Sequence, residues 1–160
     1  MIYEITVKEI TPQPMVAIRV TVPREQLGDV MDEVVPEVWH YLAEQSITPA
    51  GPPFIRYVRI DMTHTLDIEL GVPVPAGTPG TTGTLPAGRY VSLLHVGHYD
   101  ELMAANATLQ AWASEHGVTF DVTPGDDGDH WGARVEHYLT NPAEEPDPSR
   151  WQTEIAYLTV

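Results

Sequence analysis

The strongest constraint on the fold is that one order of extended and helical segments occurs twice along the chain. In the first half, residues 2–10 and 15–22 have the alternating, β-branched character that predicts strands. Residues 24–45 place apolar side chains three and four positions apart, which is the spacing of an amphipathic helix. Two further strands are predicted over 54–60 and 66–74, so the first half has the order β-α-β-β.

The second half repeats this order after a break in composition. Residues 75–83 (PAGTPGTTG) have the Gly, Pro and Thr content of a connector. A strand over 88–96 and a helix over 99–116 follow it. Strands over 133–140 and 150–160 complete the second β-α-β-β unit.

Local matches between the halves indicate an internal duplication. Glu69 and Glu154 take the same place in the last strand of each half, and Tyr57 and Tyr138 match in the strand before it. Each match is weak alone, and their shared order along the chain is what favours a duplication.

These patterns predict an α+β fold of duplicated β-α-β-β units with pseudo-two-fold symmetry. We expect an antiparallel sheet with two main helices and a ligand cleft between the halves. The length of 160 residues predicts a single domain over 1–160. Its repeat halves span about 1–74 and 85–160, joined by the connector 75–84.

The charge balance excludes some partners. Eight Lys and Arg residues against 23 Asp and Glu give a formal charge of −15, which disfavours nucleic acid and an anionic membrane surface. There is no cysteine, so disulfides, thiolate metal sites and Cys nucleophiles are excluded. The chain has no long apolar run, and its N-terminus lacks the pattern of a signal peptide, so a cytoplasmic location is expected.

Glu154 is the candidate functional carboxylate that the strand pattern favours. Both faces of the predicted final strand are largely apolar, so a carboxylate there needs a hydrogen-bonding network, a cationic ligand or its own proton. A structural carboxylate tied up by Tyr, Thr or Arg is the ordinary alternative. Glu136 is a second candidate, although it shares a strand face with Arg134 and Tyr138, and an Arg134–Glu136 pair would explain it.

Aromatic residues are the candidate ligand contacts. Aromatic faces near one buried carboxylate would trap a flat or cationic organic molecule through stacking and cation–π attraction. Most aromatic residues in any domain belong to its core, which is the alternative for each of them. The candidates at helix ends or in strands facing the predicted cleft are Trp39, Phe54, Tyr57, Tyr90, Tyr99, Trp112, Trp131, Tyr138 and Trp151.

No metal and no cofactor are expected. The seven histidines are scattered, without an HExxH motif or a clustered carboxylate at ligand spacing. The acidic segment 126–129 lacks the terminal Glu of a calcium loop, so we interpret it as a solvated turn. No Walker loop, GxGxxG or GxSxG motif occurs, so nucleotide binding and serine hydrolysis have no local support.

Six segments, spread over nearly the whole chain, carry a family resemblance. They are GPPFIRY (51–57), DIELGVPV (67–74), LPAGRY (85–90), HVGHYDEL (95–102), EHYLTNP (136–142) and WQTEI (151–155). Taken together and in this order, they resemble the GyrI-like, or AraC-type effector-binding, small-molecule-binding domain family. Two positions depart from the family pattern, because His98 and Leu158 stand where Pro is usual.

The resemblance implies a pocket between the halves with a buried Glu near its floor, a role that falls on Glu154 in the WQTEI segment. It implies binding of bulky hydrophobic, aromatic or cationic compounds, for drug or effector sensing or for sequestration. Many relatives are fused to helix-turn-helix DNA-binding domains in transcription regulators, so a separate regulator is a possible partner of a monomer or dimer of this chain.

Two alternatives come from other relatives. One is hydrolysis of cyclopropane-bearing reactive natural products, with Glu154 and Tyr138 as the catalytic residues. The other is an interaction protein that inhibits DNA gyrase, with an acidic surface that imitates the charge of DNA.

Overall fold

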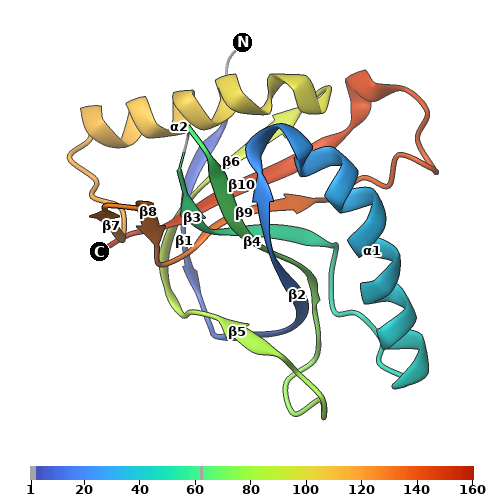
Figure 1. Cartoon of the computed structure of the whole chain (residues 1–160). Coiled ribbons are helices and arrows are strands. Elements are labelled where there is room, and N and C mark those ends of the chain that lie inside the picture. The colour runs from blue at the N-terminus through green and yellow to red at the C-terminus, as the bar shows by residue number, and fades with distance from the viewer. Residues whose placement is uncertain (1–2, 62) are drawn as a thin grey trace.

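The fold is a curled, mostly antiparallel sheet with two helices, an α+β arrangement (Figure 1). A computed structural model describes residues 3–61 and 63–160, so residue 2 of the predicted first strand lies outside the described residues. The helices are α1 (Leu27–Glu44) and α2 (Leu102–Glu115), with short 3-10 turns η1 (Arg24–Gln26), η2 (Tyr99–Glu101) and η3 (Pro148–Arg150). The strands are β1 (Ile5–Ile10), β2 (Gln13–Pro23), β3 (Phe54–Ile60), β4 (Thr65–Pro73), β5 (Gly83–Leu85), β6 (Gly88–Val96), β7 (Val122–Gly125), β8 (Gly128–Trp131), β9 (Arg134–Tyr138) and β10 (Gln152–Leu158).

The order of the strands in the sheet shows the duplication directly. The path runs β1-β6-β10-β9-β3-β4-β2-β5, so β6-β10-β9 of the second half mirror β2-β4-β3 of the first. The two halves meet where β3 pairs with β9, and the pseudo-two-fold axis passes between these strands. The predicted fold class is confirmed.

The registers agree with the matches found in the sequence. Arg56 of β3 lies opposite Glu69 of β4, and His137 of β9 lies opposite Glu154 of β10. Tyr57 directly follows Arg56, and Tyr138 directly follows His137. The match of Glu69 with Glu154 and the match of Tyr57 with Tyr138 are therefore parts of the same strand register. Each half therefore builds the same strand pair with different side chains.

Each half also lends a strand to the other. The N-terminal strand β1 pairs with β6, which belongs to the second half. The short strand β5, which was predicted to begin as connector, pairs with β2 of the first half. These exchanged strands form the two ends of the sheet.

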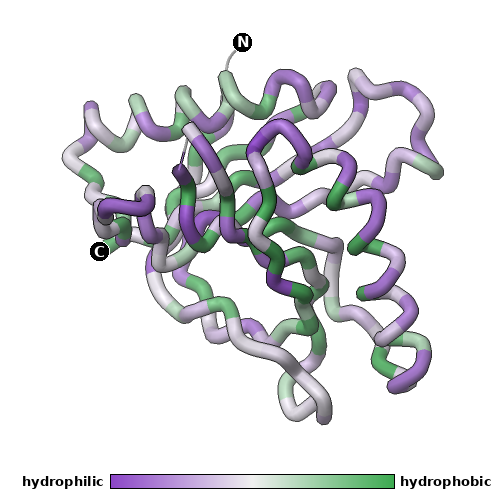
Figure 2. Tube along the Cα trace, in the orientation of Figure 1, coloured by the Kyte–Doolittle hydropathy of each residue, from purple (hydrophilic) through white to green (hydrophobic). Residues whose placement is uncertain are grey.

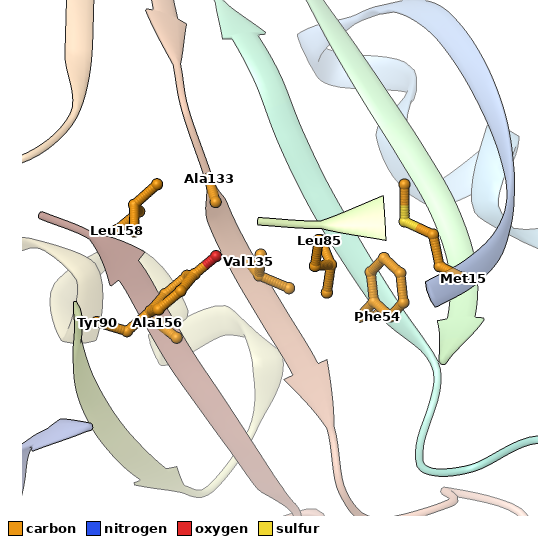
Figure 3. Packing of buried hydrophobic residues seen from close by; sticks show 8 residues of the cluster. All are labelled: Met15, Phe54, Leu85, Tyr90, Ala133, Val135, Ala156 and Leu158. Atoms are coloured by element: carbon orange, nitrogen blue, oxygen red, sulfur yellow. The ribbon is translucent and has the colours of Figure 1, made fainter. Parts of the chain in front are cut away.

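The inner surface of the curl holds one apolar cluster. It runs from side chains of β6 and β10, near one end of the sheet, across β9 and β3 to side chains of β2 and β5 at the other (Figure 3). The buried members are Met15, Phe54, Leu85, Tyr90, Ala133, Val135, Ala156 and Leu158.

Both helices pack on the other surface of the sheet. The apolar stripe of α1 covers β2 and β4, where Val38 and Leu42 pack against Val16 and Val72. Helix α2 covers β6 and β10. Figure 2 shows the expected pattern, with hydrophilic and hydrophobic residues alternating along α1. Since the helices cover the outer strands, the central pair β3 and β9 lies between them.

A hairpin precedes β9, in a part of the chain for which no strand was predicted. Strands β7 and β8 pair with each other, and β8 also pairs with β3, while the acidic segment 126–129 spans the turn between them. Arg59 anchors this turn, because its guanidinium donates to the backbone oxygen of Asp127 at 2.6 Å and to the carboxylate of Asp67 at 3.0 Å. Strand β3, with which β8 pairs, is far away in the sequence, so local composition did not predict the hairpin.

In the described part of the chain, no helix is long and apolar enough to cross a membrane.

Close packing of β4 against β2 predicts a large effect of Gly71→Ala. A Cβ at Gly71 would collide with the backbone oxygen of Val16 and with Ala17. We expect the change to lower the free energy of unfolding by about 1–3 kcal/mol, the usual cost of overpacking. Gly28→Ala in α1 is the matched control, because nothing lies within 4 Å of its Cβ. It should stabilise the helix by roughly 0.5–1 kcal/mol. Urea unfolding of both variants checks this, and equal effects would contradict it.

Candidate binding site

A buried carboxylate lies at the junction of the two halves. Glu136 of β9 is 6% exposed and stands opposite Ile55 of β3. It is also opposite Ile155 of β10, whose side chain belongs to the cluster under α2. Glu136 therefore points to the helix-covered surface of the sheet, between α1 and α2.

Two tyrosines related by the duplication bind the same oxygen of this carboxylate. The hydroxyls of Tyr57 and Tyr138 each donate to Oε1 of Glu136 at 2.9 Å. The pseudo-axis explains this convergence, because equivalent positions on β3 and β9 approach one another across it. The carboxylate itself breaks the symmetry, since its equivalent in the first half is Ile55.

The second oxygen of Glu136 is held from α2. Nδ2 of Asn106 donates to Oε2 at 3.1 Å and also to the backbone oxygen of Leu102. The hydroxyl of Tyr157 donates to Oδ1 of Asn106, and Nε2 of Gln110 donates to the Tyr157 hydroxyl at 3.1 Å. An ionised carboxylate is only an acceptor, so Glu136 can accept the hydrogen bonds from Tyr57, Tyr138 and Asn106 together. Within the described residues it has no cationic partner within 4 Å.

Burial and the nearby carboxylate change the acidity of the tyrosines. Burial raises the pKa of Tyr57 and of Tyr138 well above the ordinary value of 10.0, and the negative charge of Glu136 raises both further. Both phenols therefore stay protonated and remain donors to Glu136 near neutral pH.

A cavity of about 630 Å³ opens beside this network. Its walls come from α1, the segment 51–53, strands β3 and β4, Tyr99 and the segment 138–144. Tyr138 connects the two features, since it lines the cavity and donates to Glu136. Glu136 is not part of the cavity lining and lies one hydrogen bond behind it.

Four of the aromatic candidates line the cavity. They are Trp39, Phe54, Tyr99 and Tyr138, and of these the side chain of Phe54 packs in the cluster inside the curl. Trp39 remains 41% exposed, so a large part of its side chain is accessible. Tyr99 packs edge-on against Tyr138, with ring centroids 5.6 Å apart. Trp151 stands behind this wall, with its ring 4.7 Å from that of Tyr99.

Other aromatic candidates lie outside the cavity lining. Tyr57 acts through its hydrogen bond to Glu136. Tyr90 belongs to the cluster inside the curl and donates to the backbone oxygen of Pro86. Trp112 stacks on His116 at 4.2 Å near the end of α2. Tyr90 therefore lies on the opposite sheet surface, and neither Tyr90 nor Trp112 is part of the cavity lining.

The placement of Glu154 corrects the expectation that it forms the pocket floor. Its neighbour Ile155 faces the helices, so Glu154 faces the inside of the curl. There its Oε2 accepts from Nζ of Lys8 at 2.8 Å, and its side chain is 26% exposed. The buried carboxylate between the halves is Glu136, which the sequence ranked second. Its expected pair with Arg134 is not among the ion pairs of the described residues, because its partners are neutral donors.

Several cavity residues were not singled out as ligand contacts from the sequence. Met31 and Val35 belong to the apolar stripe of α1. Pro52, Pro53 and Asn141 lie within the GPPFIRY (51–57) and EHYLTNP (136–142) segments of the family resemblance. Their place in these segments was the one usable signal. Among the described residues, no group of three or more His, Asp or Glu side chains is arranged to hold a metal ion.

Comparison with known proteins fits this geometry. A sequence profile of the GyrI-like small molecule binding domain matches residues 3–157. The chain belongs to the GyrI-like family. No protein of curated function matches the chain by sequence.

Solved structures share the GyrI-like fold. The C-terminal domain of EcmrR has a TM-score of 0.77 at 20% identity, with 100% of this chain and 99% of that domain covered. EcmrR in a cryo-EM complex with DNA has a TM-score of 0.74 at 19% identity, with 98% of this chain and 57% of that chain covered. This chain therefore spans just over half the length of that EcmrR chain. SAV2435 bound to tetraphenylphosphonium has a TM-score of 0.67 at 11% identity, with 100% and 94% covered.

The raised pKa of the two tyrosines predicts a pH dependence of stability. Above the unfolded tyrosine pKa of about 10, the unfolded chain loses phenol protons that the folded chain keeps. This contribution to stability is present below that pH and is lost as the pH rises toward the folded-state pKa. Tyr57→Phe and Tyr138→Phe each remove one such phenol. Above about pH 10, the free energy of unfolding of each variant should therefore fall less steeply with pH than that of the wild type. The two slopes should differ by about 1.4 kcal/mol per pH unit.

Urea unfolding between about pH 8 and pH 11 measures this slope. Each variant should also lose about 1–3 kcal/mol near neutral pH, because Glu136 loses a donor. Slopes identical to that of the wild type would contradict the network.

Proposed function

We propose that this chain binds bulky lipophilic organic cations in the cavity between α1 and the segment 138–144. The observation that carries the proposal is the lining, which combines apolar and aromatic side chains with acidic ones and contains no Lys or Arg among the described residues. Its volume of about 630 Å³ suits a drug-sized molecule.

Negative charge is available at two depths. Asp32 of α1 and Glu144 lie at the cavity and are exposed, so they can attract a cation as it enters. Glu136 lies deeper, behind Tyr138, and makes hydrogen bonds only with neutral donors among the described residues. A buried charge without a cationic partner is costly, and a bound organic cation would offset that cost.

Aromatic rings supply the rest of the recognition. Trp39, Tyr99 and Tyr138 present ring surfaces to the cavity, which favours flat or cationic groups through stacking and cation–π attraction. Two likenesses support this assignment. SAV2435, which shares the fold, was solved with tetraphenylphosphonium, and the EcmrR C-terminal domain is a further structural neighbour. Sensing or sequestration of such compounds is the role that we infer, with a separate regulator as the partner if the chain acts in transcription.

The other roles stay predictions. In the hydrolase alternative, Tyr138 and Glu154 act on a reactive ring, and only Tyr138 lines the cavity. An inhibitor of gyrase would depend on the acidic surface and not on the cavity.

Replacement of the two candidate carboxylates tests the proposal and separates their roles. Glu136→Gln should weaken tetraphenylphosphonium binding by roughly tenfold or more, because one charge close to the ligand is removed. Glu154→Gln is the matched control and should bind like the wild type, since its charge is paired with Lys8 on the other sheet surface. Calorimetric titration gives both affinities. Absence of binding to the wild type, or equal loss in both variants, would overturn the proposal.

A pair of tryptophans tests the cavity wall. Trp39→Ala should weaken binding of the same cation by roughly 3–10-fold, as expected for loss of one aromatic contact. Trp112→Ala removes a ring stacked on His116, outside the cavity, and should leave the affinity unchanged. Quenching of the remaining tryptophan fluorescence reports both, and a stronger effect of Trp112 would place the ligand elsewhere.

A further inference from the structure

The guanidinium of Arg134 is surrounded by aromatic rings beside the buried carboxylate. Its central carbon lies 4.8 Å from the ring centroid of Trp131 and 4.8 Å from that of Tyr157. The ring of Tyr57 is a third neighbour, with its centroid 5.9 Å away. Distances of up to about 6 Å from a ring centroid are those of cation–π attraction.

Rings, and not anions, hold this cation in place. Arg134 forms no ion pair within the described residues, and its Nε is buried without a hydrogen-bond partner. The indole nitrogen of Trp131 is likewise buried without a partner. An arginine fixed for stability would normally satisfy its donors, because an unpaired buried donor is costly. Among the described residues, the contacts recorded for the guanidinium of Arg134 are therefore with aromatic faces.

The rings are continuous with the carboxylate network. Tyr57 contributes its ring to the Arg134 contact and its hydroxyl to Glu136, and Tyr157 donates to Asn106, which binds Glu136 in turn. Arg134 and Trp131 are both partly exposed, so solvent reaches this side of the network. The cavity lies on the other side, behind Tyr138.

We propose that Tyr57, Trp131 and Tyr157 form an aromatic cage for a small quaternary ammonium group, and that Arg134 is its resident occupant. Arg134 thereby keeps external cations out of the cage and limits binding to the cavity on the Tyr138 side. The cage is a second cation position. The inference that this cleft selects cations rests on the proposed function. Quaternary ammonium groups suit it because they carry charge without hydrogen-bond donors.

Refilling an emptied cage tests the proposal. Arg134→Ala removes the occupant, whereas Arg134→Met fills the same space with an uncharged side chain. Thermal unfolding of the full chain is measured with tetramethylammonium chloride, against NaCl at equal ionic strength. At saturating concentration the Tm of the Ala variant should rise by about 2–5 °C relative to NaCl. The wild type and the Met variant should show no difference between the salts. Equal shifts in all three proteins, or none in the Ala variant, would overturn the proposal.

A second measurement decides the matter if the Ala variant does not fold. The Met variant should bind tetraphenylphosphonium about tenfold more tightly than the wild type, because a neighbouring positive charge is gone. Neutral triphenylphosphine oxide should bind both equally. An unchanged ratio of cation to neutral affinity would refute the role of Arg134. A wild type that binds no tetraphenylphosphonium would instead count against the proposed function.

Discussion

The pairing of β3 with β9 is the interaction on which the rest of the structure depends. It joins the two halves into one sheet and sets equivalent residues against each other across the pseudo-axis. Tyr57 and Tyr138 can share one oxygen of Glu136 only because this register holds. Since α1 and α2 pack over the outer strands, the same pairing also leaves the centre of the sheet available for a site.

The duplication gives both halves the same arrangement of strands, whereas the candidate site depends on positions where the two halves differ. Ile55 and Glu136 are equivalent positions that face each other, yet one is apolar and the other is a carboxylate. Two buried carboxylates at these directly opposed positions would repel one another, whereas a single carboxylate can accept hydrogen bonds from tyrosines of both halves. The strand pairs on the inner surface diverged as well, with Arg56–Glu69 in one half and His137–Glu154 in the other.

Local patterns predicted the elements well and the site less well. Strand alternation and helical spacing located α1, α2 and the main strands, and the order of segments indicated the duplication. Alternation could not decide which face of β10 meets the helices, because both faces are apolar: one lies under α2 and one lies inside the curl. Glu154 was therefore favoured over Glu136. The partners that distinguish them, Lys8 and Tyr57, come from distant strands that no local pattern reveals.

The exchange of end strands limits how this molecule can move. With β1 paired to β6 and β5 paired to β2, neither half completes its own part of the sheet. A hinge motion that separates the two halves would have to break the β1–β6 and β2–β5 pairings as well as the central β3–β9 pairing. Such a motion is therefore disfavoured. Changes in the shape of the cavity would then involve side chains of α1 and of the segment 138–144 more than the sheet. The exchange also makes every stable portion of the chain depend on contacts that are distant in sequence, which favours folding in one slow, cooperative step.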